Sequence, residues 1–290
     1  MSNPTNLSSP AAVNQILHRF KLSPQKRFGQ NFLVDANILG RIVDSGGVGP
    51  GDQAFEIGAG LGVLTKALSE RVGETGRVVT VEYDSRLLSV LEETLAGLPQ
   101  TSVIPADVLS LDLAQTFRDN FDTDRPVSVI ANIPYQITSP LIAALMEQKK
   151  VVSRLVFLVQ KEVAQRLAAP PGSPEYGAFS VFCQYHATVE QLFTVPRTVF
   201  FPPPDVTSAV IRLTPRQKPA VDVADEAAFF AVVKAAFGQR RKTISNALGN
   251  SPDLGWSKDR VAAALFATGI SPDRRGETLS LAEFAAIAAG

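Results

Sequence analysis

Glycines and residues with carboxylate or amide side chains recur where predicted strands of this sequence end. These residue types can bind a small polar ligand. The stretch FEIGAGLGVLT places Gly58, Gly60 and Gly62 between a predicted strand and a predicted helix. Glycines there allow a tight turn and a close approach of the ligand. The spacing is G-x-G-x-G and not the G-x-G-x-x-G of dinucleotide-binding loops, and a glycine turn can also serve packing alone.

Acidic residues near the glycine loop indicate which ligand it would bind. Glu56 stands just before the loop, where a carboxylate would repel a pyrophosphate. S-adenosylmethionine carries a sulfonium and an ammonium but no phosphate, and it suits this charge. Glu82 ends the next predicted strand, a position typical of ribose recognition, and Asp107 follows the third strand, where it could accept a hydrogen bond from an adenine amine. Either acid alone is more often a cap, but together with the glycines they predict a nucleoside cofactor site.

The stretch VSVIANIPYQITSPL runs from a fourth apolar strand into Asn132, Pro134 and Tyr135. An exocyclic adenine amine is a poor nucleophile because its lone pair is delocalised into the ring. The Asn132 oxygen and a backbone carbonyl near Pro134 could accept its hydrogens and free the lone pair, and Tyr135 could stack on a flipped base. The alternative is an asparagine-capped turn with a surface tyrosine. The stretch thus favours methyl transfer to an adenine amine.

Alternating strands and helices must position these residues. From about residue 52, strand-like segments at 53–58, 77–83, 101–107, 127–134 and 154–160 alternate with helical periodicity. This pattern predicts a parallel sheet covered on both faces. The later segments 186–195 and 207–215 have no clear helix between them, and we expect an antiparallel hairpin at the sheet edge.

A polar, proline-punctuated segment at residues 214–225 precedes a region of helical pattern only. We therefore predict an α/β domain over residues 1–217, with an N-terminal extension, and a small all-helical domain over residues 218–290.

Composition narrows the class of protein. The chain has 28 basic and 28 acidic residues, a single cysteine and no apolar run of the roughly 20 residues that a membrane span needs. The N-terminus is polar, and no His/Cys cluster has metal-ligand spacing. We expect a soluble, cytoplasmic monomer without a disulfide, a metal or a membrane partner.

Longer motifs carry a family resemblance. The segments QNFLVD, EIGAGLGVLT, VEYD, NIPYQITSPL, QKEVAQRL, FPPPDVTSAVIRL and FGQRRKTISNAL occur in the order seen in the rRNA adenine dimethyltransferases. The sequence resembles their bacterial KsgA (RsmA) type over roughly residues 25–285. The resemblance implies a Rossmann-like S-adenosyl-L-methionine-dependent methyltransferase domain followed by a helical RNA-binding domain. It implies dimethylation of two adjacent adenosines in a hairpin loop near the 3′ end of small-subunit (16S) rRNA, on a pre-30S particle, in ribosome biogenesis.

The resemblance also implies roles for individual residues. Cofactor contacts would come from Asn31, Leu33, Gly58, Glu82, Asp107 and Asn132. Catalysis would involve Asn132, Pro134, Tyr135 and Phe200, with Tyr135 and Phe200 sandwiching the target base. Phe201 stands where a small polar residue is common, so the choice between the two phenylalanines stays open. Arg240, Arg241 and Lys242 would contact RNA, or would form only a solvated helix face.

Two rival functions are compatible with parts of this pattern. One is the large-subunit adenine methyltransferase that confers macrolide resistance, and the segment GQRRKT favours the small-subunit type instead. The other is a non-catalytic RNA-binding or transcription-factor relative, against which the intact Gly58, Glu82, Asp107 and Asn132 weigh. The preferred mechanism is direct displacement by the amine, with positioning and electrostatics in place of a strong general base.

Overall fold

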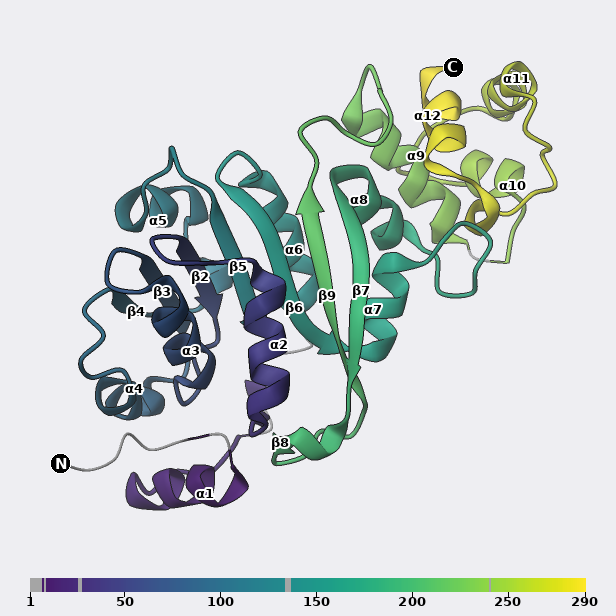
Figure 1. The fold of residues 1–290 in the computed structure, drawn as a ribbon. Coiled ribbons are helices and arrows are strands. Elements are labelled where there is room, and N and C mark those ends of the chain that lie inside the picture. The colour runs from purple at the N-terminus through teal and green to yellow at the C-terminus, as the bar shows by residue number, and fades with distance from the viewer. Residues whose placement is uncertain (1–6, 8, 26–27, 134–136, 240) are drawn as a thin grey trace. The chain divides into compact units, whose positions relative to one another are not determined.

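The computed structural model describes residues 7, 9–25, 28–133, 137–239 and 241–290 (Figure 1). Its strands are β1 (Phe32–Leu33), β2 (Gln53–Ile57), β3 (Arg77–Glu82), β4 (Thr101–Pro105), β5 (Val127–Asn132), β6 (Val152–Gln160), β7 (Ala187–Val195), β8 (Phe200–Phe201) and β9 (Ser208–Pro215). Its α-helices are α1 (Pro10–Arg19), α2 (Ala36–Gly46), α3 (Val63–Val72), α4 (Leu88–Thr94), α5 (Leu113–Asn120), α6 (Thr138–Glu147), α7 (Lys161–Ala168), α8 (Ala178–His186), α9 (Glu226–Gly238), α10 (Ile244–Gly249), α11 (Lys258–Thr268) and α12 (Leu281–Ala289).

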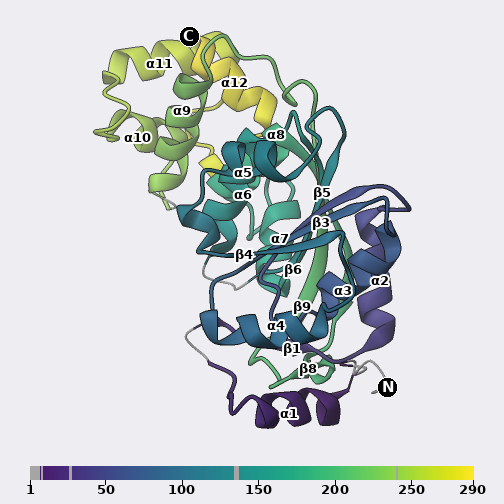
Figure 2. The same cartoon turned by 90° about the vertical axis from the view of Figure 1, so that its left-hand side faces the viewer.

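A seven-stranded sheet in the order β4-β3-β2-β5-β6-β9-β7 forms the framework. The strands from β4 to β6 are parallel, and β9 is antiparallel to β6. The expected pairing of the last two strands at the sheet edge is confirmed by the neighbouring β9 and β7. All residues of β2 are buried, as expected for a strand with helices on both faces. Helices α2 and α3 cover one face and α5 and α6 the other (Figure 2).

The register of the parallel strands brings their carboxyl ends to one edge. Ile57 of β2 pairs with Val81 of β3 and with Ala131 of β5. Residues that follow these pairs, among them Gly58 and Asn132, therefore emerge side by side. This edge is where open α/β sheets bind their ligands.

A separate two-stranded sheet fixes the segment that precedes α2. In this sheet β1 pairs antiparallel with β8, with Phe32 opposite Phe201 and Leu33 opposite Phe200. The Val34 amide continues the ladder by donating to the Val199 carbonyl over 2.8 Å. Asp35 then caps α2, because its carboxylate accepts a hydrogen bond from the Ile38 amide.

Contacts between residues divide the chain into two compact units, Met1–Ala164 with Glu190–Pro215 and Gln165–Val189 with Arg216–Gly290. The crossing after Pro215 lies close to the boundary expected at residue 217. Residues 165–189, which the sequence pattern placed in the first domain, group with the C-terminal helices. The reason is that α8 lies in the core of the second unit, where buried Tyr185 stacks on Phe229 of α9 at a ring distance of 5.0 Å.

The described part of the chain has neither a membrane-spanning helix nor a cluster of metal-ligating side chains. No helix there is long and apolar enough to cross a membrane. No group of three or more His, Cys, Asp or Glu side chains there is arranged to hold a metal ion.

Candidate active site

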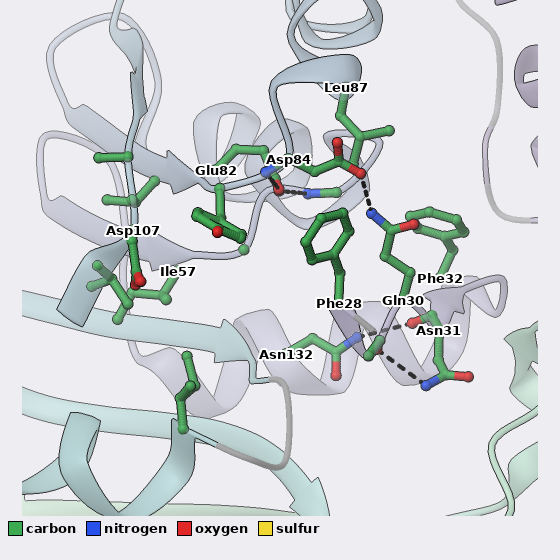
Figure 3. A pocket seen from close by; sticks show the side chains of 18 residues that line it. Phe28, Gln30, Asn31, Phe32, Ile57, Glu82, Asp84, Leu87, Asp107 and Asn132 are labelled. Atoms are coloured by element: carbon green, nitrogen blue, oxygen red, sulfur yellow. Dashed lines mark hydrogen bonds between the residues drawn. The ribbon is translucent and has the colours of Figure 1, made fainter. Parts of the chain in front are cut away.

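A cavity of about 280 Å³ lies at the carboxyl ends of the parallel strands (Figure 3). Five residues predicted from the sequence line it together: Asn31, Gly58, Glu82, Asp107 and Asn132. The sixth predicted cofactor contact, Leu33, lines an adjoining smaller pocket that shares Asn31, Gly58 and Asn132 with the cavity. The structure thus brings together residues that are spread over a hundred positions of the sequence.

Gly58 lines the cavity with backbone atoms only, because glycine has no side chain. Its φ is 81°, in the left-handed region that favours glycine, and its amide donates to the Val81 carbonyl over 2.8 Å. A Cβ atom at Gly58 would lie 3.7 Å from the carbonyl oxygen of Asn132. A side chain here would therefore narrow the gap between the ends of β2 and β5.

Glu82, the last residue of β3, is a buried carboxylate held by two backbone amides. Its Oε2 accepts from the Gly60 amide over 2.8 Å, and its Oε1 accepts from the Asp84 amide over 2.7 Å. Burial raises the pKa of Glu82, although these two hydrogen bonds oppose the shift. Each carboxylate oxygen keeps a second lone pair, so the group can also accept hydrogen bonds from a vicinal diol such as ribose.

Asp107 caps a short helix, as one of the two readings of the sequence expects, and it also lines the cavity, while its contact with an adenine amine stays a prediction. Its Oδ1 accepts from the Leu109 amide over 3.0 Å and caps the short 3₁₀ helix Val108–Ser110. The same residue lines the cavity beyond the end of β4. The cap fixes one oxygen, which orients the carboxylate at the cavity wall.

Asn132 is oriented by a residue far away in the sequence. Its Nδ2 donates to the backbone carbonyl of Asn31 over 3.1 Å. A carbonyl only accepts, so the end of the side-chain amide facing Asn31 must be the NH₂ group. The acceptor Oδ1 is thereby left at the other end of the amide, and Asn132 as a residue lines the cavity. Pro134 and Tyr135 lie outside the described residues.

Glu56 corrects one expectation from the sequence. Its side chain is 1% exposed, receives a hydrogen bond from the Thr65 hydroxyl and lines the adjoining smaller pocket but not the larger cavity. Burial raises its pKa to about 8. At pH 7 the group is mostly protonated, so Glu56 does not supply the negative charge expected beside a cationic ligand. That charge has to come from the other acids, Glu82, Asp84 and Asp107, which do line the cavity.

Several cavity residues were not assigned to the site from the sequence, among them Phe28, Gln30, Tyr83 and Asp84. Asp84 accepts from Gln30 Nε2 over 2.8 Å and from Arg86 Nε over 2.8 Å. Burial alone would raise the pKa of Asp84, but the hydrogen bonds from Arg86 and Gln30 outweigh it and lower the pKa. Tyr83 is 62% exposed and meets the ring of Phe28 edge-on at 5.5 Å. The segment VEYD contained a signal, because it places a second acid and an aromatic ring beside Glu82.

Two phenylalanines were candidates for stacking on the target base. Phe200 is 3% exposed and packs in a core cluster with Leu33 and Ile42. Phe201 is partly buried against a different cluster, which contains Phe32. A base can stack on Phe200 only where neighbouring side chains now cover the ring, so its stacking role stays a prediction.

The basic segment between α9 and α10 belongs to the second unit. Arg241 and Lys242 are exposed, and the Lys242 amide donates to the Gln239 carbonyl over 2.9 Å. Arg240 lies outside the described residues. Exposure leaves Arg241 and Lys242 accessible to a phosphate backbone, and their role in RNA binding stays a prediction.

Comparison with known proteins gives consistent results. A family model described as "Ribosomal RNA adenine dimethylase" matches residues 21–288. A Bacillus mycoides protein named "Ribosomal RNA small subunit methyltransferase A" is 46% identical over 284 residues, which are 97% of this chain and 96% of the relative. A Bacillus cereus protein of the same name matches to the same extent.

Solved structures resemble this one over most of its length. The crystal structure of the 23S rRNA methyltransferase ErmE has a TM-score of 0.68 at 25% identity, covering 89% of this chain and 98% of that one. A dimethyladenosine transferase from Plasmodium falciparum has a TM-score of 0.71 at 24% identity, covering 88% and 95%. The latter likeness supports the fold.

Proposed function

Because the chain belongs to the ribosomal RNA adenine dimethylase family, we propose that it dimethylates adenine amines of small-subunit rRNA with S-adenosylmethionine as methyl donor. The relatives named for the small subunit cover nearly the whole chain and support this substrate. The fold class expected from the sequence, a Rossmann-like methyltransferase domain with a C-terminal helical region, is confirmed.

The cavity fits this cofactor. When bound, S-adenosylmethionine supplies an electrophilic methyl group on a sulfonium centre. Glu82 would hold the ribose hydroxyls, and Asp107 would accept a hydrogen bond from the adenine amine. Gly58 would face the methionine part with backbone alone. The carboxylates at the cavity also favour a cationic ligand, since opposite charges attract most strongly where water is excluded.

One observation carries the catalytic part of the proposal, the hydrogen bond from Asn132 Nδ2 to the Asn31 carbonyl. This bond leaves Asn132 Oδ1 to accept a hydrogen from the target amine. A hydrogen bond from the amine to this oxygen draws the nitrogen toward a tetrahedral geometry. The lone pair is then less delocalised into the ring and can attack the methyl group. Asn132 therefore activates the nucleophile by position, and no described side chain has to act as a strong base. Water can then take a proton from the nitrogen, because the amine carries a positive charge once it has received the methyl group and is therefore acidic.

The same residue accommodates the second methyl transfer. A monomethylated amine keeps one hydrogen, which Asn132 Oδ1 can still accept. The acceptor proposed near Pro134 would serve only the first transfer, and the base would then depend more on stacking against Tyr135 and a phenylalanine.

The finer features of the substrate extend the proposal. We expect two adjacent adenosines in a hairpin loop near the 3′ end of the rRNA, presented on a pre-30S particle. Arg241 and Lys242, with Arg240, would bind phosphates of that particle. The enzyme would act as a monomer in the cytoplasm, where small subunits assemble.

The test supplies purified protein with S-adenosylmethionine labelled in its methyl group and with unmethylated small or large ribosomal subunits. Digested RNA is then analysed by mass spectrometry. We expect dimethyladenosine at two adjacent positions of small-subunit RNA. Label confined to large-subunit RNA would favour the macrolide-resistance activity, and no label on either would favour a non-catalytic relative.

A further inference from the structure

The short segment Phe28–Asn31 forms hydrogen bonds with residues at the ends of two strands, one on each side of the glycine loop. At one side, Gln30 Nε2 donates to Asp84 Oδ2 over 2.8 Å, just beyond the end of β3. At the other side, the Asn31 carbonyl accepts from Asn132 Nδ2 over 3.1 Å, at the end of β5. Because β2 lies between β3 and β5, this segment, which we call the strap, crosses the edge of the sheet at the cavity (Figure 3).

Gln30 is held at both ends of its side-chain amide. Its Oε1 accepts from the Gln25 amide over 2.8 Å, while its Nε2 reaches Asp84. The Phe28 amide also donates to the Gln25 carbonyl over 3.1 Å. A 180° rotation of the Gln30 amide would exchange its donor and acceptor ends and break both hydrogen bonds. These two bonds therefore orient its NH₂ group toward Asp84.

The Asp84 end of the strap is polar and charged. Arg86 forms an ion pair with Asp84, and its guanidinium carbon lies 5.9 Å from the centre of the Phe28 ring. The Asp84 amide donates to Glu82, whose other oxygen accepts from Gly60. A chain of hydrogen bonds thus connects Gln30 on the strap to the proposed ribose-binding acid and to the glycine loop.

We propose that Gln30 and Asp84 are positioning residues of the methyl transfer. Their hydrogen bond closes the strap over the bound cofactor and, through the Asn31 carbonyl, holds the Asn132 amide with its oxygen toward the target amine. This inference rests on the proposed function. The strap would also have to open and close once for every methyl group transferred, because each transfer consumes one cofactor molecule. The strap must open at the Gln30–Asp84 end to release S-adenosylhomocysteine and close again before the next transfer.

The variant Gln30→Glu tests the inference with little change of shape. It keeps an acceptor for Gln25 but replaces the donor at Asp84 by a repelling carboxylate. The matched control is Gln115→Glu on α5, which adds the same charge and removes a comparable hydrogen bond, from Gln115 Nε2 to Asp119 over 2.6 Å, at an exposed site away from the cavity. The double variant Gln30→Glu with Asp84→Asn should restore the bond with its direction reversed.

Two rates are measured on the full chain: dissociation of S-adenosylhomocysteine by surface plasmon resonance, and single-turnover methylation of small subunits at saturating S-adenosylmethionine. For Gln30→Glu we expect dissociation about tenfold faster and methylation about tenfold slower, the effect of removing one hydrogen bond to a charged group. The control should match the wild type, and the double variant should recover at least half of each effect on a logarithmic scale. Should Gln30→Glu fold poorly by circular dichroism, Gln30→Leu takes its place in the same two measurements.

The outcomes separate this inference from the proposed function. If the wild type binds cofactor and methylates small subunits while Gln30→Glu behaves like the control, the strap has no positioning role and the proposed function stands. A defect that Asp84→Asn does not relieve would likewise overturn the assignment to this hydrogen bond. If the wild type itself neither binds cofactor nor transfers methyl groups, the proposed function fails and the inference fails with it.

Discussion

Asn132 and Asn31 are 101 positions apart in the sequence, and a single hydrogen bond of 3.1 Å from the Asn132 side chain to the Asn31 backbone joins them at the cavity. The bond determines which end of the Asn132 amide faces the Asn31 backbone and which end is left for another partner. An asparagine side chain has a donor end and an acceptor end, and only the acceptor end can bind a hydrogen of an amine. Under the proposed function, the position of a backbone carbonyl therefore determines whether Asn132 can accept a hydrogen of the target amine.

Glu82 provides the most direct test of cofactor recognition. Glu82→Ala removes a charged acceptor for the ribose hydroxyls and should weaken S-adenosylmethionine binding by about 1–3 kcal/mol. Isothermal titration calorimetry on the folded variant measures this change, with the exposed Glu74→Ala as a control. An affinity equal to that of the control would remove Glu82 from the site.

Glu56 should make the stability of the fold depend on pH. Its pKa is raised to about 8 in the folded state from an ordinary value of 4.5. Between these values the unfolded chain ionises while the folded chain stays protonated, so folding stability falls as pH rises from about 4.5 to about 8. Glu56→Gln cannot ionise. In urea titrations its stability relative to the wild type should therefore increase from pH 5 to pH 8, and a constant difference would contradict the assignment.

The two phenylalanines can be separated by a substitution that preserves packing. Phe200→Ala would open a cavity in the core, at a cost of about 3–5 kcal/mol, and would confuse stacking with stability. Phe200→Leu keeps most of the apolar volume and removes the aromatic face. We expect it to fold and to accumulate monomethyladenosine, which mass spectrometry of digested rRNA detects. Accumulation with Phe201→Leu in its place would show that Phe201 stacks, and normal product from both would end the sandwich hypothesis.

The basic segment predicts a specific response to salt. Replacing Arg240, Arg241 and Lys242 by glutamine should lower the slope of log affinity against log salt by about one for each phosphate that the segment no longer binds. Affinity for S-adenosylmethionine should not change. Binding of small subunits measured from about 50 to about 300 mM salt, with the exposed Lys218→Gln as control, gives the slope. A slope equal to that of the control would mean that the segment is only a solvated surface.

Local patterns were sufficient to predict the parallel sheet and the residues at its strand ends. Gly58, Glu82, Asp107 and Asn132 each follow or end an apolar strand, and the carboxyl ends of parallel strands meet at one edge. The strap was not predictable in this way. The bond between Gln30 and Asp84 spans 54 positions, and no local period encodes such a pair. Burial was the second difficulty, because the sequence around Glu56 and Phe200 does not show which side chains will cover them.

We propose that Asn132 Oδ1 activates the target amine beside the cavity, and single-turnover methylation by Asn132→Ala tests this role most directly. The reaction is run with small subunits at saturating S-adenosylmethionine, and circular dichroism confirms the fold. We expect methyl transfer to slow by about 100-fold or more, the scale seen when one preorganised hydrogen-bonding group is removed from an active site, while cofactor affinity falls only in part. Near-normal single-turnover methylation by this variant would contradict the catalytic role of Asn132.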